Sequence, residues 1–165
     1  LLSRRQRQMC IRDRNTRIPL KIDISTGDII TPKEINYTYK LMFEDRSIHI
    51  LAYNIETVLA EKLETIITRD VVNTRIRDFY DVAVLSIEKE NEISLGKLKL
   101  ALVATAKKRK SIEIIQNGLS ILERIEKDEG MKVLWMNYQN KFDYAQDYNW
   151  QMVMDSIKSL YLKAI

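Results

Sequence analysis

The apolar residues of this chain follow two periods, one typical of helices and one typical of strands. From Ile55 to Ile67 they recur three and four positions apart, so they gather on one face of an amphipathic helix. Similar stripes follow downstream and predict helices at about 55–69, 74–89, 94–109, 111–127, 131–142 and 149–162. We expect Asn117-Gly118 to split the fourth of these helices, because that dipeptide is a strong helix stop. Gly130 is expected to be a helix C-cap before Met131.

Ahead of the helices the pattern changes to strict alternation. Apolar and polar residues alternate from Ile18 to Ile24, which is typical of a half-buried strand. Tyr37 to Met42 and Ile48 to Ala52 flank Glu44-Asp45-Arg46 and predict a hairpin. The sequence therefore predicts an α+β protein, with a short β part followed by a long α part.

A lysine interrupts the apolar stripe of the first helix. Lys62 stands one turn from Val58 and one turn from Ile66. Its ammonium is therefore expected either to snorkel past the edge of the core or to point into a cleft, and snorkelling is the commoner outcome. Arg69 and Asp70 are expected to close this helix.

Two aspartates lie one turn apart on the second helix. Carboxylates at the spacing of Asp78 and Asp81 can hold a metal ion, orient a lysine or arginine, or act as a general base. They can also form ordinary ion pairs, because Arg75 and Arg77 have the helical spacing for that. The residues alone favour ion pairs, since a charged helix face is usually only a solvated face.

Three segments, taken together, resemble the signature of a known family. They are KIDISTGDIITP, YNIETVLAEKLETIITR and NTRIRDFYD, in that order. This combination is similar to the AbiEii/AbiGii toxin family, nucleotidyltransferases of bacterial abortive-infection and type IV toxin–antitoxin systems. The resemblance extends from about Asn15 onward. After Leu85 it rests on the length and general helical character of the sequence rather than on motifs. It implies a remnant of a nucleotidyltransferase mixed β-sheet core, followed by a mostly α-helical C-terminal part.

The resemblance also implies roles for charged residues on the first two helices. Lys62 would be catalytic and would contact the phosphates of a bound nucleotide. Asp78 and Asp81 would complete the Arg-Asp motif near the active site and position Lys62 or a reacting group. Arg77, beside them, would help to bind the nucleotide.

Further candidates lie on the strand and at the two ends of the first helix. By resemblance, Asp23 would be a catalytic residue that holds metal. Its place in the alternating strand agrees, because it projects from the polar face beside Lys21, although a cross-strand pair is the commoner role for such a carboxylate. Glu56 and Arg69 are less certain members of the same site.

The family chemistry is Mg²⁺-dependent transfer of a nucleotide from an NTP to an acceptor such as tRNA, countered by a separately encoded antitoxin. Such a displacement at phosphorus usually needs two metal ions, which this family holds with a Gly-Ser turn followed by Asp-x-Asp. That motif does not occur in this sequence. We therefore expect an N-terminally truncated chain that is inactive by itself. The alternative is a non-catalytic helical interaction module whose Arg-Asp cluster is a structural ion-pair network.

The positive charge of the chain lies at its N-terminus. Residues 1–14 hold five arginines and one aspartate, a net charge of +4 that equals that of the whole chain. We interpret this segment as a non-native or disordered basic leader, with an RNA-binding arm as the alternative. Residues 15–52 would then be a partial nucleotidyltransferase β core, and residues 53–165 a helical region that carries the Lys and Arg-Asp motifs.

Cysteine content and hydropathy narrow the class of protein. The single cysteine, Cys10, lies in the leader, so the rest of the chain offers no thiol for disulfides, nucleophilic catalysis or zinc. No apolar run approaches the ~18 residues of a membrane span. We expect a cytoplasmic protein without a membrane partner.

Three other features could carry function, and each has a commoner structural explanation. The basic run at 107–110 could contact an RNA backbone, but basic residues in a last helical turn also complement the helix dipole. His49 is expected to be structural, because it has no partner at motif spacing. The aromatic residues near the C-terminus could form a partner surface, although packing is the commoner role. They are Trp135, Tyr138, Phe142, Tyr144, Tyr148 and Trp150.

Overall fold

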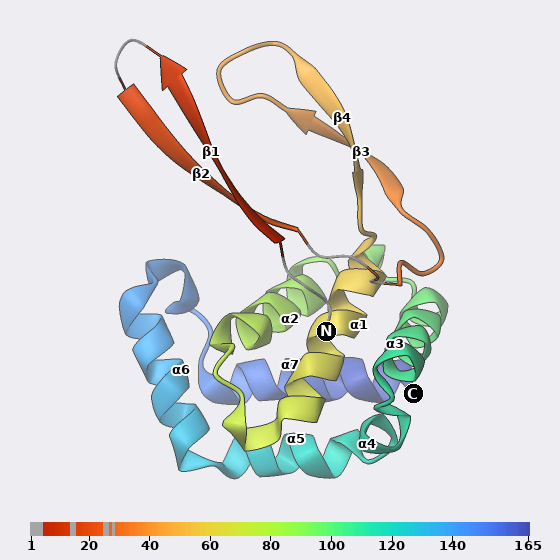
Figure 1. The fold of residues 1–165 in the computed structure, drawn as a ribbon. Helices are drawn as coiled ribbons and strands as arrows, with labels where there is room; N and C mark the ends of the chain where they lie inside the picture. The colour runs from red at the N-terminus through yellow and green to blue at the C-terminus, as the bar shows by residue number, and fades with distance from the viewer. Residues whose placement is uncertain (1–4, 14–15, 25–26, 28) are drawn as a thin grey trace.

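Two β-hairpins and a body of α-helices make up this protein (Figure 1). The structure is a computed structural model that describes residues 5–13, 16–24, 27 and 29–165. Its strands are β1 (Arg5–Asp13), β2 (Thr16–Ile24), β3 (Ile35–Lys40) and β4 (Ser47–Ala52). Its α-helices are α1 (Ile55–Arg69), α2 (Ile76–Glu88), α3 (Leu95–Arg109), α4 (Ile112–Gln116), α5 (Gly118–Lys127), α6 (Glu129–Lys141) and α7 (Trp150–Ala164). Short 3-10 helices are η1 (Asp70–Val72), η2 (Glu90–Glu92) and η3 (Asp143–Ala145). The α+β class and the mostly helical C-terminal part are confirmed.

Local side-chain signals set several helix boundaries. Asn54 caps α1, Asp128 caps α6 and Asn149 caps α7, each by accepting a hydrogen bond from a backbone N–H three residues further on. Such a cap contributes about 1 kcal/mol to stability. The break at Asn117-Gly118 is confirmed, since α4 ends and α5 begins there. The prediction for Gly130 is wrong, because Asp128 starts α6 and places Gly130 in its first turn.

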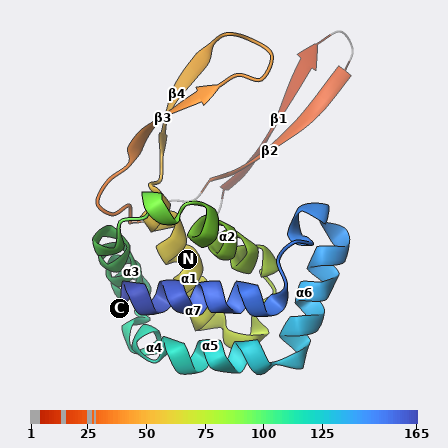
Figure 2. The same cartoon turned by 180° about the vertical axis from the view of Figure 1, so that it is seen from behind.

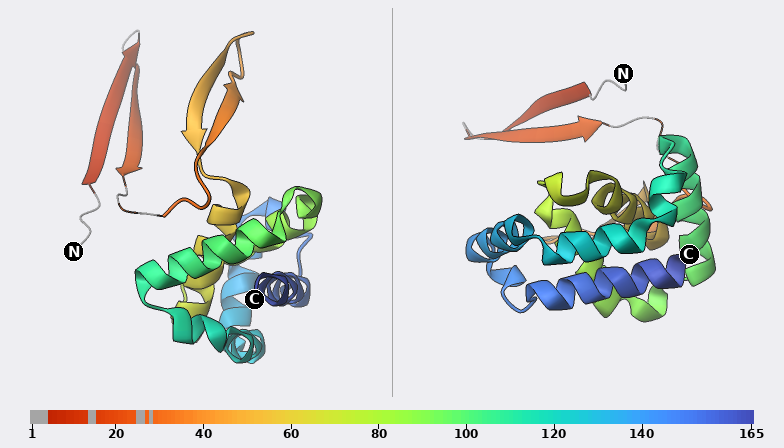
Figure 3. Two further views of the ribbon diagram at one scale, coloured as in Figure 1. Left: turned by 90° about the vertical axis from the view of Figure 1, so that its right-hand side faces the viewer. Right: turned by 90° about the horizontal axis from the view of Figure 1, so that it is seen from below.

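The helical body is built around α1, which contacts α2, α3, α4 and α5. Helix α7 crosses behind α1 in the view of Figure 1, lies at the front in Figure 2, and packs against α2, α5 and α3. Seen from below, α5 and α7 lie side by side (Figure 3). The fully buried side chains that fill the space between these helices include Leu59, Leu63, Ile66, Ile67, Phe79, Leu98, Leu102, Leu122, Ile125, Trp135 and Met154.

An ion pair between an exposed arginine and a buried glutamate joins α1 to the end of α3. Glu64 is 3% exposed and lies 2.5 Å from the guanidinium of Arg109. The hydroxyl of Ser111 donates a second hydrogen bond to the same carboxylate, at 2.7 Å. Of the basic run at the end of α3, Lys107 and Lys108 lie exposed in the last turn, as the dipole interpretation expects. Arg109 instead holds two helices together.

The strands form two separate antiparallel hairpins. β1 pairs with β2 from Arg5 opposite Ile24 to Asp13 opposite Thr16, and β3 pairs with β4. The described strands therefore do not form the predicted mixed sheet, because each pairs only with its neighbour along the chain. The backbone of residues 5–13 pairs with β2, and the interpretation of residues 1–14 as a non-native or disordered leader stays a prediction.

The second hairpin has one polar and one apolar face. On the polar face, the hydroxyl of Thr38 lies 3.2 Å from Nδ1 of His49 across the strands, so this histidine contacts its hairpin partner. On the other face, Tyr37 stands opposite Ile50 and Tyr39 opposite Ile48. These four side chains are each more than two-fifths exposed.

The hairpins stand off one end of the helical body (Figures 1 and 3), and the base of the second is tied to α1. The amide of Asn54 donates to the carbonyls of Thr31 and Lys33, at 2.8 and 3.0 Å. Thr57 both donates to and accepts from the backbone of Thr31, at 3.0 Å each. The start of α1 is thus fixed relative to the chain that leads into β3.

The helices do not have the form of membrane spans. Within the described part of the chain, none combines the length and the apolar character that crossing a bilayer requires.

Candidate functional site

Helices α1 and α2 bring a lysine and two aspartates together. Lys62 points from α1 toward α2, where Asp78 and Asp81 share a face one turn apart. The ammonium lies 2.8 Å from Oδ1 of Asp78 and 2.8 Å from Oδ2 of Asp81. The three side chains are between 15% and 23% exposed, so the cluster sits at the edge of the core and reaches the surface. We call these three residues the Lys62 cluster.

The charges in the Lys62 cluster support one another. Burial acts to lower the pKa of Lys62, but the hydrogen bonds and negative charges of Asp78 and Asp81 outweigh it, and the pKa is raised above its ordinary value. The ammonium is therefore charged at neutral pH. It carries three N–H donors, and among the described residues the two carboxylates take two of them. The third can bind a further anionic oxygen.

Arg77 adds a second cation beside the cluster. Its Nε lies 3.8 Å from Oδ2 of Asp81, while its side chain is 77% exposed. A cation held this loosely can turn to a ligand at little energetic cost, because an exposed ion pair contributes only about 0–1 kcal/mol. The expected pairing of Arg77 with Asp81 is confirmed as a long contact.

Glu56 and Arg69 lie away from the Lys62 cluster. Glu56 is 4% exposed, and its carboxylate accepts a hydrogen bond from the backbone N–H of Ser94 at 3.0 Å, where α3 begins. This contact joins α1 to α3 and explains an acidic residue at that position without a catalytic role. Arg69 is exposed at the last residue of α1, two turns beyond Lys62.

Asp23 lies in β2, opposite Gln6 of β1. Its side chain lies outside the part of the chain that the structure describes, so its role as a metal ligand remains a prediction. The strand assignment itself is confirmed.

Two tyrosines border the Lys62 cluster, and the residue patterns did not point to them as site residues. Tyr80 precedes Asp81 on α2, and Tyr138 approaches from α6. Burial, the hydrogen bond with Tyr144 and the negative charge of Asp81 raise the pKa of Tyr138, whereas the charge of Arg77 lowers it. The ring of Tyr138 lies 6.0 Å from that of Tyr80, the residue before Asp81 in α2. Spacing could not reveal this neighbour, since it is 57 residues from Asp81 in the chain.

The predicted aromatic set divides into packing residues and surface residues. Trp135 is 1% exposed, and its ring stacks with Tyr138 at 5.7 Å. Trp150 contacts Phe79 in the core at 5.8 Å. Tyr144, in contrast, is 50% exposed. The expectation of a packing role is confirmed for the tryptophans but not for Tyr144.

The described side chains do not form a site that fits a divalent metal. Asp78 and Asp81 already share one cation, because the ammonium of Lys62 sits between their oxygens where a metal ion would have to be. Elsewhere in the described part of the chain, no three His, Cys, Asp or Glu side chains are grouped to hold a metal.

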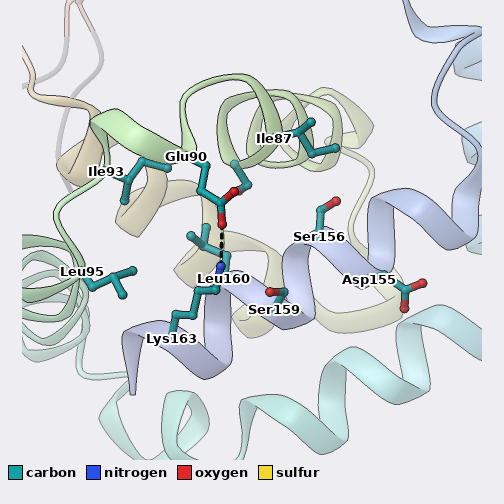
Figure 4. Close-up of a pocket in the computed structure, with 10 residues that line it drawn as sticks. Ile87, Glu90, Ile93, Leu95, Asp155, Ser156, Ser159, Leu160 and Lys163 are labelled. Carbon is teal, nitrogen blue, oxygen red and sulfur yellow. Dashed lines mark hydrogen bonds and ion pairs between the residues drawn. The ribbon is translucent and has the colours of Figure 1, made fainter.

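A pocket of about 370 Å³ lies between the end of α2, η2 and α7 (Figure 4). Ile87, Ile93 and Leu160 give it apolar walls, and Lys163 reaches across it to Glu90 at 2.9 Å. The pocket does not include the Lys62 cluster. The candidate site is thus a surface cluster and not this pocket.

The match to known proteins covers most of the chain, the Lys62 cluster included. Residues 4–156 match the family described as "Nucleotidyl transferase AbiEii toxin, Type IV TA system". The match begins further upstream than the resemblance did, and it includes nearly all of the described strands and helices. No curated protein and no solved structure matches this chain. The chain belongs to the AbiEii family of nucleotidyltransferase toxins from type IV toxin–antitoxin systems, which implies a cognate antitoxin.

Proposed function

We propose that this chain carries the phosphate-binding side of a nucleotidyltransferase site, in which Lys62 contacts the triphosphate of an NTP. The observation that carries the proposal is the ammonium of Lys62, fixed at 2.8 Å from both Asp78 and Asp81. A lysine on a flexible stem usually loses much rotamer freedom when it binds. Here the carboxylates have already fixed it, so less ordering remains to oppose ligand binding.

The reaction would transfer a nucleotide from an NTP to an acceptor such as tRNA. An acceptor oxygen attacks the α-phosphorus, and pyrophosphate leaves with the electron pair of the broken P–O bond. Negative charge grows on the departing pyrophosphate, and fixed cations stabilise it. Lys62 supplies one such cation and the exposed Arg77 a second, while Asp78 and Asp81 act as positioning residues.

Asp23 is the one residue to which this proposal gives a role in binding metal. Nucleotidyltransferases of this kind generally use a divalent metal, which we expect to be Mg²⁺. The Lys62 cluster does not fit such an ion, and the Gly-Ser turn with Asp-x-Asp does not occur in the sequence. We therefore propose that this chain by itself binds the triphosphate without transferring a nucleotide.

A thermal-shift titration with NTP and Mg²⁺ tests the proposal on the chain as it is. A ligand at one hundred times its Kd stabilises a protein by about 2.7 kcal/mol, and we expect the midpoint of unfolding to rise accordingly. The Lys62→Ala variant should lose this rise. Lys158→Ala is the matched control, since Lys158 also contacts two carboxylates, Glu126 at 2.8 Å and Asp155 at 3.1 Å. A wild-type chain without a rise, or an equal rise in Lys62→Ala, would refute the proposal.

The second candidate function is a non-catalytic interaction module held together by ion pairs. The observation that favours it is a second lysine cluster, because Lys158 also joins two helices, α7 and α5, through both carboxylate oxygens of Glu126. In that case both lysine variants should lose stability to a similar extent. The response should depend on salt and not on nucleotide, since salt screens ion pairs.

A further inference from the structure

Four aromatic rings form a step beside the Lys62 cluster. They belong to Tyr80 of α2, Tyr138 of α6, Phe142 at the end of α6, and Tyr144 of η3, and we call them the aromatic step. The ring of Tyr144 lies 5.0 Å from that of Tyr80 and 5.3 Å from that of Phe142, with only 25° between the last two planes. Tyr138 contacts Phe142 at 4.8 Å. The rings thus support one another in a continuous set.

Tyr144 is held in place and yet open to solvent. Its hydroxyl lies 3.1 Å from that of Tyr138, and its carbonyl accepts a hydrogen bond from Tyr80 at 3.3 Å. Its surface is nevertheless 50% exposed. A ring fixed on one side and open on the other is suited to stacking, because little entropy remains to be lost on binding.

The aromatic step and the Lys62 cluster share helix α2. Tyr80 is the residue before Asp81, and it follows Arg77 by one helical turn. The pKa of Tyr80 is raised mainly by burial, with Asp81 among the negative groups that add to the effect. At the far end of the step, the ammonium of Lys141 lies 5.5 Å from the centroid of the Phe142 ring. A cation therefore lies over the ring at one end of the step, and Arg77 stands one helical turn from Tyr80 at the other.

We propose that Tyr144, supported by Phe142, stacks a nucleobase whose phosphate binds at Lys62 and Arg77. Aromatic rings flanked by cations are the usual platform for single nucleotides and single strands, because every base has a face that stacks. The inference rests on the proposed function, since it places the base of a ligand whose phosphate that proposal assigns to Lys62. The base can belong to the NTP or to the end of a single-stranded RNA acceptor.

The test measures the affinity of the full chain for three probes: NTP, inorganic tripolyphosphate and a short single-stranded RNA. Tyr144→Ala should weaken the binding of NTP or of the RNA by about tenfold, the size of one lost stacking contact. Tripolyphosphate, which has no base, should bind unchanged. Tyr144→Phe keeps the ring and should restore the lost affinity. Tyr37→Ala is the matched control, because Tyr37 is 49% exposed on the hairpin β3–β4.

Each outcome decides between the two proposals. A loss for NTP alone assigns the base to the NTP, and a loss for the RNA alone assigns it to the acceptor; both support stacking. Unchanged affinity of Tyr144→Ala for both base-containing probes overturns this inference while leaving the phosphate site intact. An equal loss for tripolyphosphate also overturns it, because Tyr144 would then act by holding the structure. If the wild-type chain does not bind tripolyphosphate, the proposed function fails and this inference fails with it.

Discussion

The helical body and the second hairpin use their apolar residues in opposite ways. In the body, residues such as Phe79 and Leu63 are 0% exposed, and their stripes meet across helix interfaces. In the hairpin, Tyr37 and Ile50 lie on one face and are 49% and 43% exposed. A two-stranded hairpin is only marginally stable in water without such packing. Of these two parts, the helical body must therefore supply almost all of the stability.

The difference also bears on the candidate site. Lys62, Asp78 and Asp81 stand on helices whose buried faces fix them, so their charged groups meet at defined distances. A site built on packed helices is more precise than one on a poorly packed element. The helical body therefore carries the part of the site whose geometry is fixed.

The largest expected loss of stability comes from a substitution in the helical body, and it tests the contrast with the second hairpin most directly. Phe79→Ala removes a fully buried ring that also contacts Trp150 at 5.8 Å, and we expect a loss of about 3–5 kcal/mol in the free energy of unfolding. Tyr37→Ala in the hairpin should cost about 0.5 kcal/mol or less. Urea unfolding followed by circular dichroism measures both. Equal losses would mean that the hairpin face is packed as tightly as the body.

The ion pair between α1 and α3 gives the next effect. Arg109→Ala leaves the carboxylate of Glu64, which is 3% exposed, without its charged partner. We expect a loss of about 2–3 kcal/mol, since an uncompensated buried charge is costly. Lys108→Ala removes an exposed cation of the same turn that is not the partner of Glu64, so it is the control and should leave the urea midpoint almost unchanged. The pair would be dispensable if the two variants unfolded at the same midpoint.

A pair of glycines tests how tightly the helices meet. A Cβ at Gly118 would lie 2.6 Å from the ring of Tyr161, and that ring cannot easily move, because its hydroxyl donates to Ile115 at 2.7 Å. Gly118→Ala should cost about 1–3 kcal/mol. At Gly96 an added Cβ meets nothing within 4 Å, so Gly96→Ala should be neutral or stabilise by up to about 1 kcal/mol. Thermal unfolding of both variants would reveal a looser α5–α7 interface if Gly118→Ala were as stable as wild type.

The smallest expected effect is a pH dependence of stability that arises within the helical body. The hydrogen bond from Lys158 lowers the pKa of Glu126 below its ordinary value. The stability that this provides is present above the unfolded pKa of 4.5 and is lost as the pH falls through the lowered, folded-state pKa. We expect Glu126→Gln to flatten the fall of the unfolding midpoint in acid by the equivalent of about 1 kcal/mol or less. The exposed Glu123→Gln, on the same helix, is the charge control, and identical acid profiles for the two variants would contradict the assignment.

Local patterns predicted the helices well, because their signals lie within a few residues. The range 55–69 was predicted for α1 and is confirmed to the residue, since an apolar stripe and the cap at Asn54 define it. Gly130 misled because a glycine signals both the end and the start of a helix, and the side chain of Asp128 decided between them.

Long-range contacts could not be predicted from such patterns. The pairing of Glu64 with Arg109 spans 45 residues, and the contact of Tyr138 with Tyr80 depends on where α6 lies against α2. From the residues alone, the meeting of Lys62 with Asp78 and Asp81 was one option among several. They favoured snorkelling for Lys62 and surface ion pairs for the aspartates, and the resemblance changed that preference. The catalytic roles of these residues remain predictions.

The most direct test of the central claim is a calorimetric titration of the full chain with tripolyphosphate at low ionic strength. The account predicts one binding event for the wild-type chain and for Lys158→Met, and its loss in Lys62→Met, which keeps the length of the side chain but not its charge. Binding that survives in Lys62→Met, or that disappears equally in Lys158→Met, would contradict the claim that the ammonium between Asp78 and Asp81 is the phosphate site.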